Sequence, residues 1–208
     1  MSKKDLILIT IIGAAVGVLA QPVIANLIVQ PSAALRIGLF LGFLVLAPLA
    51  LFIAYVAGRV VPVLYQFAKF AAVGTLNSFV DVGVLNLGIF LSGITGGLGF
   101  SLFKAISFLA ATTNSFFWNK YWTFSATSRS GPGEVVKFYV VAMIGGIVNV
   151  GIASFIVNGV THSSSISPAL WANIGALAGV ASALLWDFLG YKYLVFKRAE
   201  PAVGDKST

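Results

Sequence analysis

The 208-residue sequence contains no cysteine, one histidine and few charged residues. The absence of cysteine excludes a disulfide framework, a thiolate nucleophile and a thiolate metal site, and His162 alone cannot form a histidine-clustered metal centre. Charged residues make up 9% of the chain and apolar residues 59%, whereas a soluble domain carries about a quarter charged residues. The composition therefore excludes an ordinary soluble enzyme, a disordered chain and a nucleic-acid-binding module. It indicates an integral membrane protein.

The apolar runs predict an all-α, polytopic membrane helix bundle with six transmembrane helices, each of which needs about 20 residues. Proline and polar residues at positions 29–32 separate the first two runs, and a glycine-rich turn at 92–97 separates the third from the fourth. The last uncharged stretch is too long for one span, and the polar residues 161–165 followed by Pro168 divide it into two. The uncharged or nearly uncharged runs are residues 6–35, 37–58, 70–91, 100–117 and 138–186.

Basic residues are distributed asymmetrically about the predicted spans. The 13 lysines and arginines give the chain a net charge of +7, but they lie between apolar runs and do not form the basic patch of a nucleic-acid-binding surface. Arg36 and Lys104 fall on one side of the predicted topology. Because cytoplasmic loops are enriched in lysine and arginine, we expect a multi-pass protein of the cytoplasmic (inner) membrane with both termini in the cytoplasm. The basic residues on the cytoplasmic side are Lys3, Lys4, Arg59, Lys69, Lys120, Arg129, Lys137, Lys192, Lys197, Arg198 and Lys206.

Two segments in the second part of the chain resemble each other. Lys69-Phe70 and Lys137-Phe138 each open a span, and they lie 68 residues apart. The segments also close alike, since Ser115–Phe124 corresponds to Asp187–Phe196. An even number of spans in each copy gives both copies the same orientation, so their pseudo-two-fold axis should lie along the membrane normal. The pattern predicts two parallel two-helix repeats, residues 69–124 and 137–196.

The opening and closing segments resemble the GtrA-like family of small polytopic membrane proteins. Lys69–Asp81 is close to the family's opening pattern, and Ser115–Phe124 is similar to its closing pattern, roughly Asn-Phe-x-x-Asn-Arg/Lys-x-Trp-x-Phe. Ser115 and, in the second copy, Asp187 stand where that pattern has Asn, so the second copy follows the family less closely. The resemblance covers about residues 66–198. Residues 1–65 are left as an N-terminal transmembrane hairpin with an interfacial segment, and residues 199–208 as a cytoplasmic tail.

The resemblance implies a part in cell-surface polysaccharide synthesis. Family members are associated with moving polyprenyl-phosphate-linked sugars across the cytoplasmic membrane, or with supporting the glycosyltransferase that makes or uses these lipids. We therefore expect a flippase for a polyprenyl-phosphate sugar. The alternative is a non-catalytic membrane partner that recruits or positions a polyprenyl-phosphate glycosyltransferase. A third alternative, a proton-coupled exporter that titrates Asp81, has no support from the resemblance.

An enzymatic function is not expected. The longest predicted cytoplasmic loop between spans, Ser125–Val135, is too short for a nucleotide-sugar-binding domain, and no phosphate-binding glycine loop, pair of catalytic carboxylates or nucleophile–base set occurs. We also expect no cofactor and no metal. Small-xxx-small pairs such as Gly13/Gly17 and Gly38/Gly42 allow helices to approach closely. They fit either tight packing inside one bundle or a homodimer.

Polar residues at membrane depth are the candidates for a functional site, because a charged side chain there costs at least about 2.5 kcal/mol. Asp81 lies about twelve residues into the third predicted span and shares a helix face with Asn77. On the fourth span, Lys104, Ser107 and Asn114 follow the three- and four-residue spacing of one face. If these spans form a hairpin, the two faces can meet.

We hypothesise that these residues bind a lipid-linked sugar, with amides and a carboxylate on the sugar hydroxyls and basic groups on the phosphate. The alternative is structural: Asp81 and Lys104 form an ion pair, the asparagines bond helix to helix, and the cytoplasmic lysines only determine topology. The expected sugar-binding residues are Asn77, Asp81, Asn114 and Asn149, together with Lys104. The expected phosphate-binding or interfacial residues are Arg36 and Lys104 in the outer half, and Lys69, Lys120 and Lys192 at the cytoplasmic interface.

Overall fold

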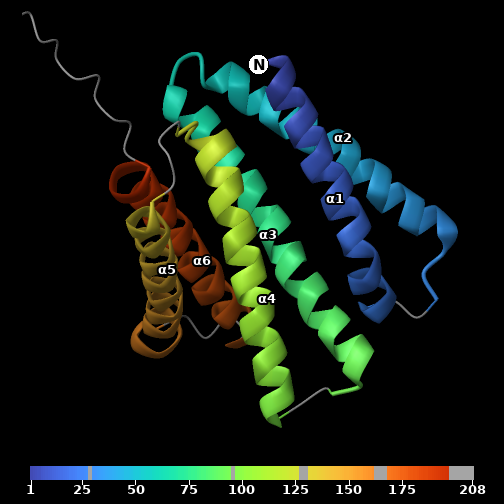
Figure 1. Ribbon diagram of the computed structural model, residues 1–208. Coiled ribbons are helices and arrows are strands. Elements are labelled where there is room, and N and C mark those ends of the chain that lie inside the picture. The colour runs from blue at the N-terminus through green and yellow to red at the C-terminus, as the bar shows by residue number, and fades with distance from the viewer. Residues whose placement is uncertain (28–29, 95–96, 127–130, 162–167, 197–208) are drawn as a thin grey trace, which may run out of the picture. The chain divides into compact units, whose positions relative to one another are not determined.

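The computed structural model describes residues 1–27, 30–94, 97–126, 131–161 and 168–196. Within these ranges all regular secondary structure is helical, which confirms the predicted all-α class (Figure 1). Two short π-helices, η1 and η2, follow long α-helices directly. The elements are α1 (Lys3–Leu27), α2 (Ala33–Ala57), α3 (Pro62–Ser92), α4 (Gly97–Trp118), η1 (Asn119–Thr123), α5 (Pro132–Gly159), α6 (Pro168–Gly190) and η2 (Tyr191–Val195).

Four of the described helices, α1, α2, α3 and α5, are long and apolar enough to cross a membrane. The chain is therefore a membrane protein with helical spans. Helices α4 and α6 contain 22 and 23 residues, the length of a span, but they are not among these four, so the count of six spans stays a prediction. His162, Arg129 and the tail at 199–208 lie outside the described residues.

Helix α3 begins earlier than the apolar run predicts. Pro62 stands at its start, where a missing N–H costs no helical hydrogen bond. Its 31 residues extend over about 46 Å at 1.5 Å per residue, more than the roughly 30 Å of a bilayer's hydrocarbon core. The segment expected to lie separately at the interface is therefore, from Pro62 onward, the first turns of α3. The helix ends at Gly93, whose φ of +70° suits glycine.

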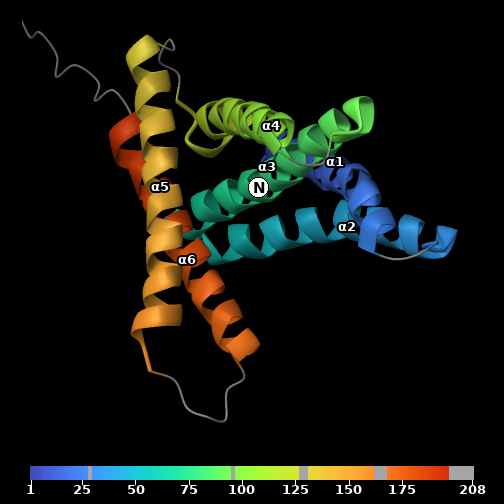
Figure 2. The ribbon, with the colours of Figure 1, turned by 90° about the horizontal axis from the view of Figure 1, so that it is seen from below.

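Residues 1–125 form one compact unit and residues 126–208 a second. In the first unit, α3 packs against α1, α2 and α4, with α1 and α2 side by side and α4 along α3 (Figures 1 and 2). The N-terminal hairpin thus belongs to the same compact unit as α3 and α4. The core of this unit consists of Ile9, Ile12, Val16, Leu51, Val73, Leu76 and Trp122.

In the second unit, α5 packs along α6 and η2. The rings of Phe138 and Tyr191 stack with centroids 4.2 Å apart. The indole Nε1 of Trp186 donates to the backbone oxygen of Val141 at 3.1 Å. Gly190 allows this approach, because a Cβ at that position would lie 2.6 Å from Cγ1 of Val141. Aromatic stacking thus joins α5 to η2 at this end of the helix pair.

The two units share an order of elements, α3–α4–η1 in the first and α5–α6–η2 in the second. Each ends in a five-residue π-helix. The N–H of Phe124 donates to the oxygen of Asn119, and that of Phe196 to the oxygen of Tyr191, both at 2.8 Å. π-Helical turns are rare in proteins, and those that do occur are often located at functional sites. The same unusual turn at both predicted closing segments is what an internal repeat would produce.

Gly13 provides a test of the packing between α1 and α2. A Cβ at this position would lie 2.5 Å from the backbone oxygen of Phe43 and 3.1 Å from Cβ of Ala47, so one helix has to move. We expect Gly13→Ala to lower the free energy of unfolding by about 1–3 kcal/mol, which is the usual cost of overpacking. Equilibrium unfolding of the purified protein in mixed micelles measures this change. Gly42→Ala is the matched control, because no atom lies within 4 Å of its Cβ. Equal losses at both positions would contradict this packing.

Candidate functional site

Two hydrogen-bonded side-chain pairs connect α3 and α4. Nδ2 of Asn114 donates to Oδ1 of Asn77 at 2.7 Å, and Oγ of Ser107 donates to Oδ1 of Asp81 at 2.5 Å. Ser107 is fully buried, whereas the other three side chains are half-buried. The structure thus brings together three of the predicted sugar-binding residues on facing helices, at the spacing that the sequence predicts.

The position of these pairs along α3 places them well inside the membrane segment. Asp81 follows Pro62 by 19 residues and precedes Ser92 by 11. Amides, a hydroxyl and a carboxylate at such depth offer donors and acceptors in a region of low dielectric, where a hydrogen bond is strong and an unmet polar group is costly. The pairs can therefore bind helix to helix, or exchange their partners for the hydroxyls of a ligand.

The other predicted outer and repeat residues are not joined to these pairs. Lys104 lies on α4, but its side chain is outside what the structure describes, so its pairing with Asp81 stays a prediction. Asn149 is half-buried on α5, in the second unit. Arg36 lies half-buried in the first turns of α2, and its backbone oxygen accepts a hydrogen bond from Nε2 of Gln21 at 3.2 Å.

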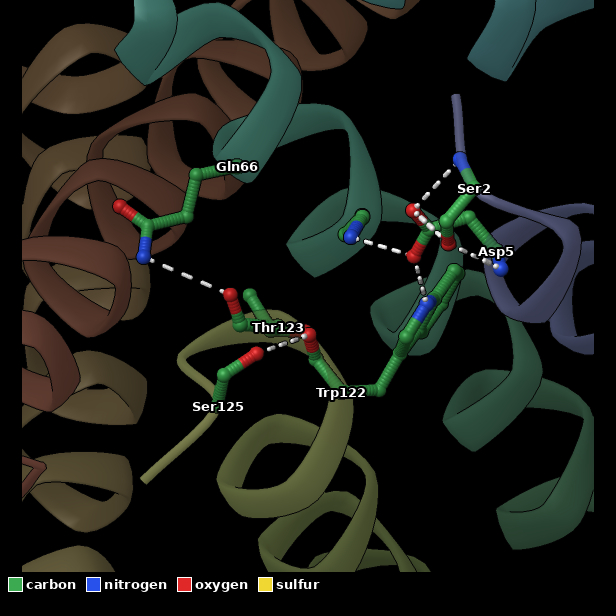
Figure 3. A network of polar contacts seen from close by, with 7 residues as sticks. Ser2, Asp5, Gln66, Trp122, Thr123 and Ser125 are labelled. Atoms are coloured by element: carbon green, nitrogen blue, oxygen red, sulfur yellow. Dashed lines mark hydrogen bonds and ion pairs between the residues drawn. The ribbon is translucent and has the colours of Figure 1, made fainter. Parts of the chain in front are cut away.

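A second polar cluster joins α1, α3 and η1 around the carboxylate of Asp5 (Figure 3). One oxygen, Oδ1, accepts from Nζ of Lys69 at 2.5 Å and from Nε1 of Trp122 at 2.9 Å. The other, Oδ2, accepts from Oγ of Ser2 at 2.7 Å and from the Ser2 backbone N–H at 3.3 Å. The backbone N–H of Asp5 donates back to Oγ of Ser2 at 3.0 Å, so Ser2 and Asp5 cap the start of α1 reciprocally.

The cluster is shielded from solvent and contains the ion pair between Asp5 and Lys69, whose side chains are each 12% exposed. Nζ of Lys69 also lies 4.6 Å from the ring centroid of Tyr65 and 5.6 Å from that of Trp122, within the range of cation–π attraction. Removal of one partner from a buried ion pair costs about 3–5 kcal/mol, because the other charge is left uncompensated. The contact also brings the start of α1, the first turns of α3 and the π-helix after α4 together at one end of the first unit.

This cluster was missed by the sequence interpretation, which gives neither Asp5 nor Trp122 a partner. The available signal was weak: Asp5 is one of six acidic residues in the chain, and it stands directly before an apolar run. Lys69 is predicted as an interfacial cation, and the structure instead directs its ammonium to Asp5. A pairing between residues 64 positions apart cannot be read from local spacing.

The lysines of the two π-helices differ in environment. Lys120 in η1 is fully buried, with Nζ 5.8 Å from the ring centroid of Phe116 and 5.9 Å from that of Tyr121. The sequence predicts a phosphate-binding or interfacial role for Lys120, and in the structure this lysine is buried beside Asn119. Lys192 in η2 is half-buried. Its Nζ lies 5.3 Å from the ring of Tyr193, an arrangement that suits the predicted interfacial position.

A helical membrane domain with polar side chains paired between adjacent helices is the class of protein that this fold and site define. The GtrA/DPMS transmembrane domain family matches residues 69–196, and the chain belongs to this family. The match confirms the resemblance seen in the opening and closing segments. It begins at Lys69 and ends at Phe196, so α1, α2 and Asp5 lie outside it. No curated protein and no solved structure matches the chain.

The contact between Asn77 and Asn114 can be measured by a double-mutant cycle. We expect Asn77→Leu and Asn114→Leu to couple by roughly 0.6–1.7 kcal/mol in the free energy of unfolding, the range of interhelical hydrogen bonds in membranes. Equilibrium unfolding of the native protein, the two single variants and the double variant in mixed micelles gives this coupling free energy. Ser78→Ala is the control, because its exposed hydroxyl donates only to Gly74 in its own helix and should not couple to Asn114. A coupling of zero between the two asparagines would refute the contact.

Proposed function

We propose that the protein translocates a polyprenyl-phosphate-linked sugar across the cytoplasmic membrane during cell-surface polysaccharide synthesis. Membership of the GtrA/DPMS family indicates the handling of lipid-linked sugars in polysaccharide synthesis. Translocation, the lipid carrier and the cytoplasmic membrane are the further steps of this proposal. It also includes six spans, two parallel repeats and cytoplasmic termini.

The observation that supports translocation is the pair of polar contacts between α3 and α4. A passage for a sugar through a bilayer needs hydrogen-bonding groups at depth, because each unmet polar group costs several kcal/mol there. Asn77 and Asn114, with Asp81 one turn further along α3, supply amide and carboxylate groups at that depth. Their half-buried side chains lie at the contact between two helices that a small separation would open.

The second candidate is a non-catalytic partner that anchors or positions a glycosyltransferase, either alone or as a homodimer. The same contacts also favour this second candidate. Asn114 donates to Asn77 and Ser107 to Asp81, so the four side chains already have hydrogen-bond partners within the protein. A bundle that only holds another protein requires such internal bonds and needs no path for a sugar. Reconstitution separates the two functions, because only a translocase moves the lipid without a transferase.

The test is reconstitution of the purified protein alone in liposomes that contain a fluorescent polyprenyl-phosphate sugar. A membrane-impermeant quencher measures how fast the lipid changes leaflets. We expect Asp81→Asn to lower this rate roughly tenfold, because loss of one charge-assisted hydrogen bond removes about 1.5 kcal/mol. Lys104→Gln is expected to act in the same direction if its ammonium binds the phosphate.

The exposed Ser78, altered to Ala, is the control that leaves the rate unchanged, since its hydroxyl donates to Gly74 of its own helix. Variants are compared only after normal insertion has been verified by protease accessibility. Lipid that crosses solely when a glycosyltransferase is added would favour the anchoring function. Equal rates for native protein, Asp81→Asn and Lys104→Gln would remove these two residues from the proposed path.

A further inference from the structure

Two donors in the first unit converge on a single oxygen atom. Nζ of Lys69 and Nε1 of Trp122 lie 2.5 and 2.9 Å from Oδ1 of Asp5. A lysine ammonium and an indole N–H have no acceptor capacity, so the point where they meet can be filled only by an acceptor, and an anion suits it best. Charge-assisted hydrogen bonds of this kind are the strong ones, and phosphate oxygens are as suitable an acceptor as a carboxylate.

The donors and the acceptor come from different parts of the chain. Lys69 and Trp122 lie within the family's transmembrane domain, whereas Asp5 lies on α1, outside the matched residues 69–196. The family domain thus supplies a preformed pair of donors, and the N-terminal helix of this chain supplies the anion. Asp5 stands in the first turn of α1, and helix ends fray more easily than helix interiors.

The second copy of the predicted repeat shows that this pairing is not a packing requirement of the motif. Lys137, which corresponds to Lys69, has an exposed side chain. Leu194 stands in η2 where η1 has Trp122, so the indole donor is missing there. The element order and the π-helical ending therefore form in the second unit without a counterpart of Trp122. The fold alone therefore does not explain why Lys69 and Trp122 converge on one point in the first copy.

A groove opens beside Trp122, one of the two donors. Its volume is about 250 Å³, and it is lined by Lys4 and Leu8 of α1 together with Phe117, Trp118, Tyr121 and Trp122. Lys4 is exposed and adds a second positive charge at its edge. An apolar and aromatic wall with an ammonium at the rim suits the first units of a lipid chain next to its phosphate.

We propose that Nζ of Lys69 and Nε1 of Trp122 form a binding site for the phosphate of a lipid phosphate, and that Asp5 occupies this site as an internal anion until the lipid displaces it. The site takes a phosphate ester on a long apolar chain, whose first units lie in the groove beside Trp122. The assignment of that lipid to a polyprenyl phosphate rests on the proposed function. The N-terminal helix then regulates access of the lipid to the family domain.

The test is a titration of the purified protein with a polyprenyl monophosphate, in which native mass spectrometry measures how much lipid is bound. In Asp5→Asn the competing charge is removed while the side chain keeps its size and an oxygen for Trp122. We expect this variant to bind the phosphate lipid about tenfold more tightly than the native chain, which corresponds to roughly 1.4 kcal/mol of lost competition. Asp5→Glu keeps the charge and should bind like the native protein. The polyprenol without phosphate should bind all three proteins equally.

Two combined variants test the donors. Asp5→Asn with Lys69→Gln should lose the whole gain, and Asp5→Asn with Trp122→Phe should lose part of it, because Phe keeps a ring and removes the N–H. Unchanged or weaker binding by Asp5→Asn would overturn the proposal and leave the ion pair as a fastening of α1. If Asp5→Asn is not recovered in folded form, Trp122→Phe in the native chain should weaken phosphate-lipid binding several-fold, and unchanged binding would overturn the proposal.

Phosphatidic acid distinguishes the source of the phosphate. A tenfold gain for it as well as for the polyprenyl phosphate would support the site as one for lipid phosphates in general, and a gain for the polyprenyl phosphate alone would support the narrower assignment. The liposome experiment separates this proposal from the proposed function. Tighter binding without translocation would refute translocation alone, whereas translocation by the native protein without a gain in Asp5→Asn would refute the internal anion alone.

Discussion

The buried contact of Asp5 with Lys69 and Trp122 is the interaction that fixes α1 to the family domain within the first unit. It joins the start of α1 to the start of α3 and to the π-helix that ends α4. Apolar packing alone is a weak organiser between membrane helices, because lipid tails are as apolar as the side chains. A single carboxylate that satisfies an ammonium and an indole N–H supplies the direction that apolar contacts lack. The N-terminal hairpin is for this reason a part of the first compact unit and not an appendage to the family domain.

The two copies of the predicted repeat place different side chains on the same backbone conformation. Both end in a π-helix of five residues. In η1 the inward positions hold Asn119, Lys120 and Trp122, which are polar or carry a donor, and all three are buried. In η2 the buried positions are Tyr191 and Val195, and Phe138 stacks on Tyr191. The first copy therefore offers hydrogen-bonding chemistry at its closing turn, while the second offers an aromatic core.

The sequence was sufficient for those features that depend on local composition. Scarce charge predicted the membrane class. The three- and four-residue spacing on α3 and α4 predicted two polar faces that could meet, and these faces are in contact at Asn77–Asn114 and Asp81–Ser107. The start of α3 was misplaced, since apolar content marks the part of a helix inside the bilayer and not the turns before it. The cluster around Asp5 was missed, because its partners are 64 and 117 positions away and only packing brings them together. Lys120 shows the same limit: a lysine after a span is normally interfacial, but the π-helical turn directs this one inward.

One row of residues on α3 links the two polar features. Lys69, Val73, Asn77 and Asp81 follow one another in steps of four residues, and each step advances about 6 Å and turns about 40° around the helix. Over three steps the row therefore turns by about 120°. Lys69 accordingly faces α1, whereas Asn77 and Asp81 face α4. A phosphate held at Lys69 would thus lie about 12 Å along the helix from the first asparagine. The row turns from the side of α3 that faces α1 to the side that faces α4. A sugar attached to that phosphate would therefore reach the polar contacts with α4 by moving along α3 alone.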